Sequence, residues 1–370
     1  MSSITTSTLP PLYARWMEHV LSGRIPEETD ATCAECAMCS TDITLHSRSE
    51  DFYNPETKCC TFTPTLPNFL VGRILSDDDA LFAQGRLSVE ARLGAGVAVT
   101  PLGLGTPLTF RSLYAGTSTQ AFGRSKTLLC PHYREEGGGR CGIWKHRESV
   151  CITWYCKHVR GAVGAKFWKS LQRLLLAAEQ SLAQWCVYEL DIGVDALGFL
   201  FSSNPSLKQN HQPDDLALDG KVDRGLYEMA WGTWSGREQE FYREAARLVD
   251  GLEWPDILAI GGPELRICER LVRDAYSRLM SKDLPPFLEG GRMSVSQIGH
   301  ASWRVTTYSA TDPLECPRSL MAALPYFDGR STLESMSLIE QREGIRLSPG
   351  LVRKLADFEI LIPSEGRPKD

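Results

Sequence analysis

The stretch ATCAECAMCS, residues 31–40, holds three cysteines with two residues between neighbours. A Cys59-Cys60 pair follows in the stretch KCC. Two residues between cysteines form a turn that can direct both sulfurs toward one cation, and a bound cation keeps such thiols deprotonated. This spacing therefore decides how the N-terminal part is interpreted: it predicts a metal site rather than an ordinary loop.

A second group of cysteines lies in residues 130–156. The chain has 370 residues and twelve cysteines, and nine of these lie between residues 33 and 156. Stable disulfides are rare in a reducing compartment, where clustered cysteines usually indicate metal or redox chemistry. We therefore predict nine metal-binding thiolates: Cys33, Cys36, Cys39, Cys59, Cys60, Cys130, Cys141, Cys151 and Cys156.

The alternative interpretation is that a cysteine serves as a small buried hydrophobic residue. It suits Cys186 and Cys268, which lie on apolar helical faces, and also Cys316. It suits nine cysteines in two tight groups poorly.

The spacing of the cysteines does not identify the metal. Four thiolates complete a tetrahedral zinc site or an iron–sulfur cluster, so nine candidates fill two sites with one left over. The first run is typical of bacterial ferredoxins, but the fourth cysteine expected three residues later is absent, and Ser40 and Thr41 follow instead. Zinc ribbons usually have two separated Cys-x2-Cys pairs, and only the first group has such pairs. We expect iron–sulfur, of the 4Fe-4S type, before zinc.

Other side chains near the second group are candidates for supporting roles. His132, His146 and His158 are possible ligands or hydrogen-bond donors to ligands. Four further residues either bind an anion or offset the negative charge of thiolates: Arg124, Ser125, Arg140 and Arg147.

These stretches resemble a known family. CAECAMC and KCC, followed by CPHY and RCGIWKHRESVCITWYC, are similar to the CxxCxxCC cysteine-cluster family, whose YkgJ-like members are described as zinc- or iron-chelating. The matching features are Cys130-Pro131, the CGIWKHR segment at 141–147, and the closing Cys151 and Cys156. The resemblance covers about residues 30–160 and implies metal binding.

Composition narrows the classes of protein. The net charge of −6 argues against general attraction to nucleic acid or to anionic membranes. The N-terminus lacks the pattern of a secretory signal, and no stretch approaches the ~20 apolar residues that span a bilayer. We expect a cytoplasmic protein without nucleic-acid or membrane partners. No nucleotide-binding glycine motif, G-x-S-x-G or H-E-x-x-H occurs, so no catalytic residue is predicted.

Hydrophobic spacing predicts helices at 10–22, 66–75, 78–93 and 163–190. A polar loop is expected at 202–221 and a linker at 281–291. Ser331 with Glu334 forms a capping-box pattern, and Ser348-Pro349 marks another helix start.

Residues 300–363 include the stretches LPYFDGRSTLESM and GIRLSPGLVRKLADFEILIP. These stretches resemble the small PqqD-like, winged-helix fold that recognises peptides. It implies a peptide or protein partner, added as a strand at a sheet edge near SWRVTTY. A scaffold or dimerisation role is the alternative. Residues 286–370 hold ten Lys/Arg and eleven Asp/Glu, which argues against DNA binding.

Three domains are predicted: a cysteine-cluster metal-binding domain at 1–160, a helical domain packed on it at 161–285, and a winged-helix-like domain at 286–370. The expected fold class is mostly α, with a cysteine-rich N-terminal domain and a small α+β C-terminal domain. The expected function is an iron–sulfur protein that supports a redox or modifying reaction on a peptide or protein partner. The alternative is a non-enzymatic, zinc-stabilised interaction protein.

Overall fold

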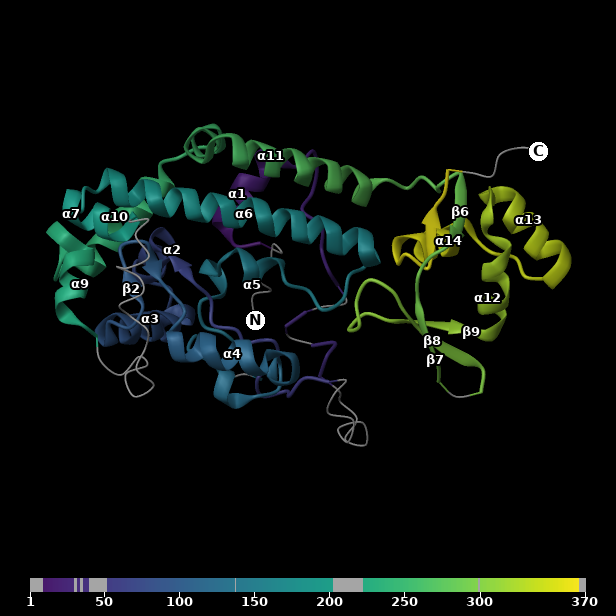
Figure 1. Ribbon diagram of the computed structural model, residues 1–370, viewed down its shortest axis with the longest axis horizontal. Helices are drawn as coiled ribbons and strands as arrows, with labels where there is room; N and C mark the ends of the chain where they lie inside the picture. The colour runs from purple at the N-terminus through teal and green to yellow at the C-terminus, as the bar shows by residue number, and fades with distance from the viewer. Residues whose placement is uncertain are drawn as a thin grey trace. The chain divides into compact units, whose positions relative to one another are not determined.

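The structure of the protein, a computed structural model, describes residues 9–29, 32–33, 36–39, 52–136, 138–201, 222–298 and 300–365. Helices make up 55% of it, and the sheets are small and antiparallel (Figure 1). The prediction of a mostly α-helical protein is confirmed. Among the described helices, none is both long and apolar enough to cross a membrane.

The chain divides into two compact units, each assembled from separated stretches. Unit 1 contains Met1–Pro26, Cys33–Trp154 and Gln172–Arg270, and unit 2 contains Glu27–Thr32, Tyr155–Leu171 and Leu271–Asp370. Unit 1 therefore takes residues from both the first and the second predicted domain.

Unit 1 contains most of the helices. Its elements are α1 (Pro11–Val20), β1 (Leu66–Pro67), α2 (Asn68–Leu75), η2 (Ala80–Phe82), α3 (Ala83–Ala95), β2 (Val99–Thr100), β3 (Gly103–Leu104), α4 (Leu108–Ala121), η3 (Lys126–Leu128), β4 (Tyr133–Arg134), β5 (Arg140–Cys141), η4 (Trp144–His146), α5 (Ser149–Thr153), α7 (Val194–Phe201), α9 (Arg224–Trp231), η5 (Gly232–Trp234) and α10 (Glu238–Asp250). Two long helices, α6 (Gly161–Glu189) and α11 (Trp254–Met280), supply residues to both units.

The four helices predicted in the first half of the chain are confirmed, as α1, α2, α3 and α6. No helix was predicted at α4, α7 or α9. Helix α4 has no buried residue, so it lacks the apolar stripe by which a helix is identified in a sequence. The polar loop expected at 202–221 lies outside the described residues.

The core of unit 1 forms where α2 packs closely on α10. A side chain on Gly72 of α2 would meet the backbone oxygen of Tyr242 at 1.8 Å, so only glycine permits this approach. Buried Val71, Phe241 and Trp231 surround the contact. The small sheet β1-β3-β2 adds Leu66 and Leu104, which are paired across its antiparallel register.

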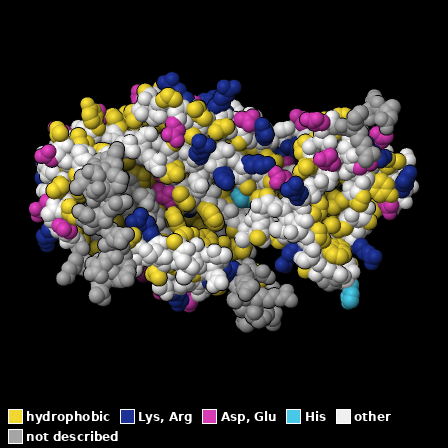
Figure 2. Space-filling model, in the orientation of Figure 1, with side chains coloured by type: hydrophobic (Ala, Val, Ile, Leu, Met, Phe, Trp, Pro, Cys, Tyr) yellow, Lys and Arg dark blue, Asp and Glu magenta, His cyan; other side chains and the backbone are white. Residues whose placement is uncertain are grey.

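One surface of unit 1 is hollowed. On the face shown in Figure 2, hydrophobic side chains gather around a hollow in the region that α4, α5 and the unit 1 part of α6 occupy in Figure 1. A pocket of about 350 Å³ lies beside α5 and this part of α6, with Val150 and Leu176 among its lining residues.

Unit 2 combines small sheets with short helices. Its remaining elements are β6 (Phe287–Gly290), β7 (Ser294–Ile298), β8 (Ser302–Thr306), β9 (Leu314–Pro317), α12 (Arg318–Ala323), η6 (Leu324–Tyr326), β10 (Asp328–Ser331), α13 (Thr332–Glu343), α14 (Pro349–Asp357) and β11 (Leu361–Pro363). The sheets have the orders β10-β6-β11 and β7-β8-β9. Leu288, Val305, Ile339 and Leu361 are among the residues of one buried core.

Two predictions for this unit are wrong. The stretch SWRVTTY was expected to form a sheet edge, but β8 lies between β7 and β9, and its residues Ser302 to Val305 pair on both sides. The segment 281–291, expected to be a linker, contains β6, the central strand of its sheet. Leu288 anchors this strand, because its side chain is buried in the core.

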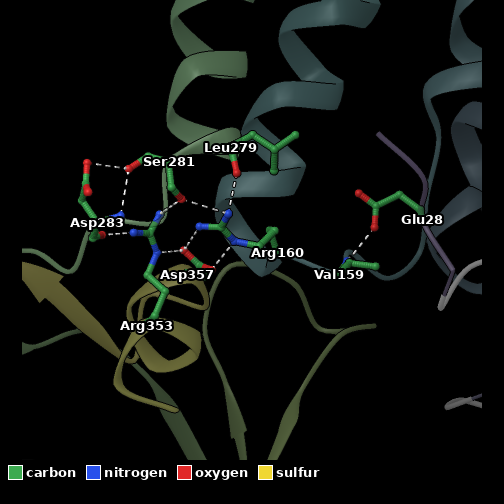
Figure 3. A network of polar contacts seen from close by, with 8 residues as sticks. All are labelled: Glu28, Val159, Arg160, Leu279, Ser281, Asp283, Arg353 and Asp357. Atoms are coloured by element: carbon green, nitrogen blue, oxygen red, sulfur yellow. Dashed lines mark hydrogen bonds and ion pairs between the residues drawn. The ribbon is translucent and has the colours of Figure 1, made fainter. Parts of the chain in front are cut away.

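A network of ion pairs joins distant stretches within unit 2 (Figure 3). Arg160, just before α6, donates to Asp357 of α14 and to the carbonyl oxygen of Leu279. Arg353 pairs with the same carboxylate at 2.9 Å. Asp357 is buried, and a buried charge is costly unless it is paired. The two guanidinium groups supply this pairing.

Candidate metal centre

All nine predicted ligands are half-buried thiols without a disulfide. Eight belong to unit 1, and Cys156 belongs to unit 2. The other three cysteines, Cys186, Cys268 and Cys316, are fully buried in apolar surroundings, as predicted.

The two cysteine groups, far apart in sequence, meet at a main-chain hydrogen bond. The backbone N–H of Cys130 donates to the carbonyl oxygen of Cys60 at 2.8 Å. Cys141 lies on β5, opposite Tyr133 of β4, and the main-chain turn from Cys130 leads directly into β4. This main-chain contact therefore brings Cys60 of the first group beside Cys130 of the second.

A glycine contact fixes the end of the β4–β5 hairpin. A side chain on Gly85 of α3 would meet the backbone oxygen of Gly142 at 2.0 Å. The backbone of α3 therefore lies directly against the residue that follows Cys141.

Main-chain N–H groups point at several sulfurs. The sulfur of Cys36 accepts hydrogen bonds from the N–H groups of Met38 and Cys39. The sulfurs of Cys130 and Cys141 accept likewise from residues two positions later, His132 and Ile143. Such bonds favour the charged thiolate, the form that binds a metal.

Thiol pairs also interact directly. A hydrogen bond from Cys39 lowers the pKa of the Cys36 thiol to about 6 and raises the pKa of Cys39. Cys59 and Cys60 form a second pair, in which the hydrogen bond lowers the pKa of Cys59 and raises that of Cys60. Each pair therefore holds one readily formed thiolate, stabilised by the thiol of its neighbour.

Burial is the largest influence on the pKa of the remaining thiols of unit 1. It raises the pKa of Cys33 to about 11 and that of Cys130 to about 12. The pKa of Cys141 and Cys151 is raised for the same reason, with the carboxylate of Glu148 adding to the effect at Cys151. A positive ion among these sulfurs would reverse this effect, because it stabilises the deprotonated form.

Two buried cations compensate the thiolates. The ammonium group of Lys58 donates to the carbonyl oxygens of Cys33 and Gly139 at 2.8 and 3.0 Å, and its charge lowers the pKa of Cys36. Arg147 stacks on Trp144 at 3.5 Å.

The charge of Arg147 partly offsets the effect of burial on the pKa of Cys33 and Cys141, and it contributes to the lowered pKa of Cys59. This favours charge compensation over anion binding as the role of Arg147. Lys58 was not predicted, although its position directly before Cys59-Cys60 was a signal.

The three histidines make contacts of other kinds. His132 is buried, and its Nδ1 lies 2.8 Å from the Ser88 hydroxyl, while burial lowers its pKa to about 3. His146 pairs through Nε2 with Asp77 at 2.7 Å. His158 belongs to unit 2, where its Nδ1 lies 3.2 Å from the hydroxyl of Tyr308.

The donor set suits a thiophilic metal, but the side chains do not converge on one point. Among the described residues, no group of three or more His, Cys, Asp or Glu side chains is arranged to hold a metal ion. Half-buried sulfurs, N–H donors and nearby cations provide the chemical surroundings that thiolate ligands require.

Comparisons with known proteins give no relative: no family model matches the chain, and neither a curated protein nor a solved structure is detectably similar. The resemblances to the cysteine-cluster and PqqD-like families stay predictions.

Proposed function

We propose that unit 1 binds metal through the thiolates of its two cysteine groups, with a 4Fe-4S cluster before zinc as the occupant. The hydrogen bond between Cys130 and Cys60 carries this proposal, because it brings one cysteine of each group together. The N–H donors that point at Cys36, Cys130 and Cys141 support it, since hydrogen bonds to sulfur are a usual feature of such sites.

The thiols of unit 1 suffice for two sites. Eight predicted ligands lie in this unit, and four thiolates complete either kind of centre. Cys156, whose carbonyl oxygen accepts a hydrogen bond from Thr311 within unit 2, is the cysteine left over.

An iron–sulfur cluster, when bound, supplies one-electron transfer. The protein's own residues would set its surroundings: Lys58 and Arg147 offset the negative charge of the thiolates, and the N–H groups orient the sulfurs. The function would then be a redox or modifying reaction on a peptide or protein partner.

Unit 2 is the proposed place for that partner, as a peptide-recognition domain of winged-helix type. Strand β7 takes the role first expected of β8, because it is largely exposed and lies at the edge of the sheet β7-β8-β9, where a strand can be added.

The test is anaerobic purification of the full chain, followed by measurement of iron, zinc and acid-labile sulfide. The proposal predicts brown protein with iron and sulfide in similar amounts. Colourless protein with stoichiometric zinc would favour the alternative, a zinc-stabilised interaction protein. Protein without bound metal would contradict both.

A further inference from the structure

The pocket of unit 1 has an unusual composition. Its walls are largely apolar, with Phe62, Leu102, Val150 and Leu176 among the lining residues. Its volume of about 350 Å³ lies at the lower end of the range for small-molecule sites. Two carboxyl groups, those of Glu148 and Glu179, also line it.

These carboxyl groups are held side by side. The hydroxyl of Ser149 donates to Glu179 Oε2 at 2.7 Å and lies 3.4 Å from Glu148 Oε2. Glu179 also accepts from the Ser149 N–H at 2.7 Å and from the hydroxyl of Tyr13. Both glutamates are nearly fully buried, with exposed fractions of 3% for Glu148 and 2% for Glu179.

Glu179 lacks a cationic partner among the described residues. Its hydrogen-bond donors, the hydroxyl of Tyr13 and the N–H and hydroxyl of Ser149, are all neutral, and no described lysine, arginine or histidine forms an ion pair with it. A buried carboxylate without a counter-ion is costly, so this position favours a bound cation or a proton. Burial and the neighbouring Glu148 raise the pKa of Glu179 to about 8, as expected for a carboxyl group without a cationic partner among the described residues.

The pocket therefore offers a hydrophobic cavity next to a buried carboxyl group that must hold either a proton or a cation. An amine with an apolar body matches both properties, because its ammonium group supplies the charge and the donors while its body displaces water from the apolar walls. We propose that this pocket binds a small organic amine, whose ammonium group pairs with Glu179. The rim residues Gln180 and Gln184 are exposed and mark the entrance.

The described residues that line this pocket include no cysteine, so the site is distinct from the proposed metal centre. Glu148, however, accepts hydrogen bonds from the N–H and the thiol of Cys151. A variant at Glu148 would disturb a predicted ligand, so Glu179 is the position to change.

The test is calorimetric titration of the full chain with phenethylamine, and with 2-phenylethanol as the uncharged probe of similar shape. The amine should bind at least about tenfold more tightly than the alcohol, and Glu179→Gln should remove this preference. Glu189→Gln, an exposed glutamate on the same helix, is the matched control and should bind like the unchanged protein.

A second variant covers the case in which Glu179→Gln does not fold. Leu176→Phe fills the pocket from a partly exposed position without changing charge, and it should weaken binding of the amine about tenfold or more. Equal binding of amine and alcohol, absence of amine binding, or undiminished amine binding by a folded Leu176→Phe variant would each overturn the proposal. Metal content is measured separately, so failure here leaves the proposed metal centre unaffected.

Discussion

The N–H of Cys130 donates a hydrogen bond of 2.8 Å to the carbonyl oxygen of Cys60. This contact joins two cysteine groups that the sequence separates widely. Because main-chain atoms make it, the contact does not require either thiol to be deprotonated. The contact therefore brings Cys60 and Cys130 together through the main chain, while the described side chains form no group of three or more arranged to hold a metal ion.

Replacing a predicted ligand should remove metal. Cys141→Ser should lose bound metal and become less soluble, because a structural metal contributes free energy of folding. Metal analysis and thermal unfolding of the purified variant measure both effects. The matched control is Cys268→Ala, which changes a buried cysteine of unit 1 that is not a predicted ligand and should keep its metal. Equal metal loss in the two variants would contradict the division between ligands and core cysteines.

Cys156 should be dispensable for metal. Eight thiols fill two four-thiolate sites, so Cys156→Ser should bind as much metal as the unchanged protein. Cys151→Ser is the comparison, since it changes the preceding cysteine of the same sequence group. The outcome that would refute this assignment is a loss of metal in Cys156→Ser as large as that in Cys151→Ser.

The stability of the protein should fall as pH rises, because of Glu179. The pKa of this carboxyl is about 8 in the folded protein, above its ordinary value of 4.5. Between these values the folded state holds a proton that the unfolded state has released, so the free energy of unfolding decreases by up to about 1.4 kcal/mol per pH unit. This stabilisation is fully present below about pH 4.5 and is lost as pH rises through about 8.

Denaturant unfolding at several pH values tests this. Glu179→Gln removes the titrating group, so its stability relative to the unchanged protein should grow from about pH 4.5 to 8 and then level off. Glu189→Gln should follow the unchanged protein. A constant difference between Glu179→Gln and the unchanged protein across this range would show that Glu179 does not titrate as described.

The buried ion pair in unit 2 should matter more than an exposed one. Asp357→Asn leaves Arg160 and Arg353 without their shared partner and should lower the free energy of unfolding by on the order of 3 kcal/mol (Figure 3). Glu359→Gln breaks the exposed pair with Lys166 and should cost less than about 1 kcal/mol. Calorimetric melting of both variants measures these losses of stability. Similar losses in Asp357→Asn and Glu359→Gln would contradict the prediction that the buried pair contributes more.

The sequence allowed correct prediction where a single helix has its own hydrophobic or capping pattern. Helix α6 buries Phe167, Leu171 and Leu175 at helical spacing, and Ser348 caps α14 by accepting from the N–H of Leu351 at 3.2 Å. Ser331 occupies the N-cap position of α13, but its side chain makes no capping hydrogen bond. A capping pattern thus located the helix start even where the bond is absent.

Features that depend on packing between distant segments were missed. Lys58 is charged, which usually indicates an exposed residue, yet the carbonyl oxygens of two separate loops bury its ammonium group. Glu148 and Glu179 lie close together because the start of α5 packs beside α6. The spacing of residues along the sequence gives no sign of this contact. Strand β8 has the composition of any half-buried strand, so its central place in the sheet was not predictable from its residues.

X-ray absorption at the edge of the bound metal tests the central claim most directly, because it identifies the atoms bonded to the metal. Thiolate ligation of either iron or zinc predicts a first shell of sulfur, near 2.3 Å for zinc. The amount of sulfur-bound metal should fall in Cys141→Ser and be unchanged in Cys268→Ala. A first shell of oxygen and nitrogen, or no bound metal in protein purified without chelators or oxygen, would contradict the account.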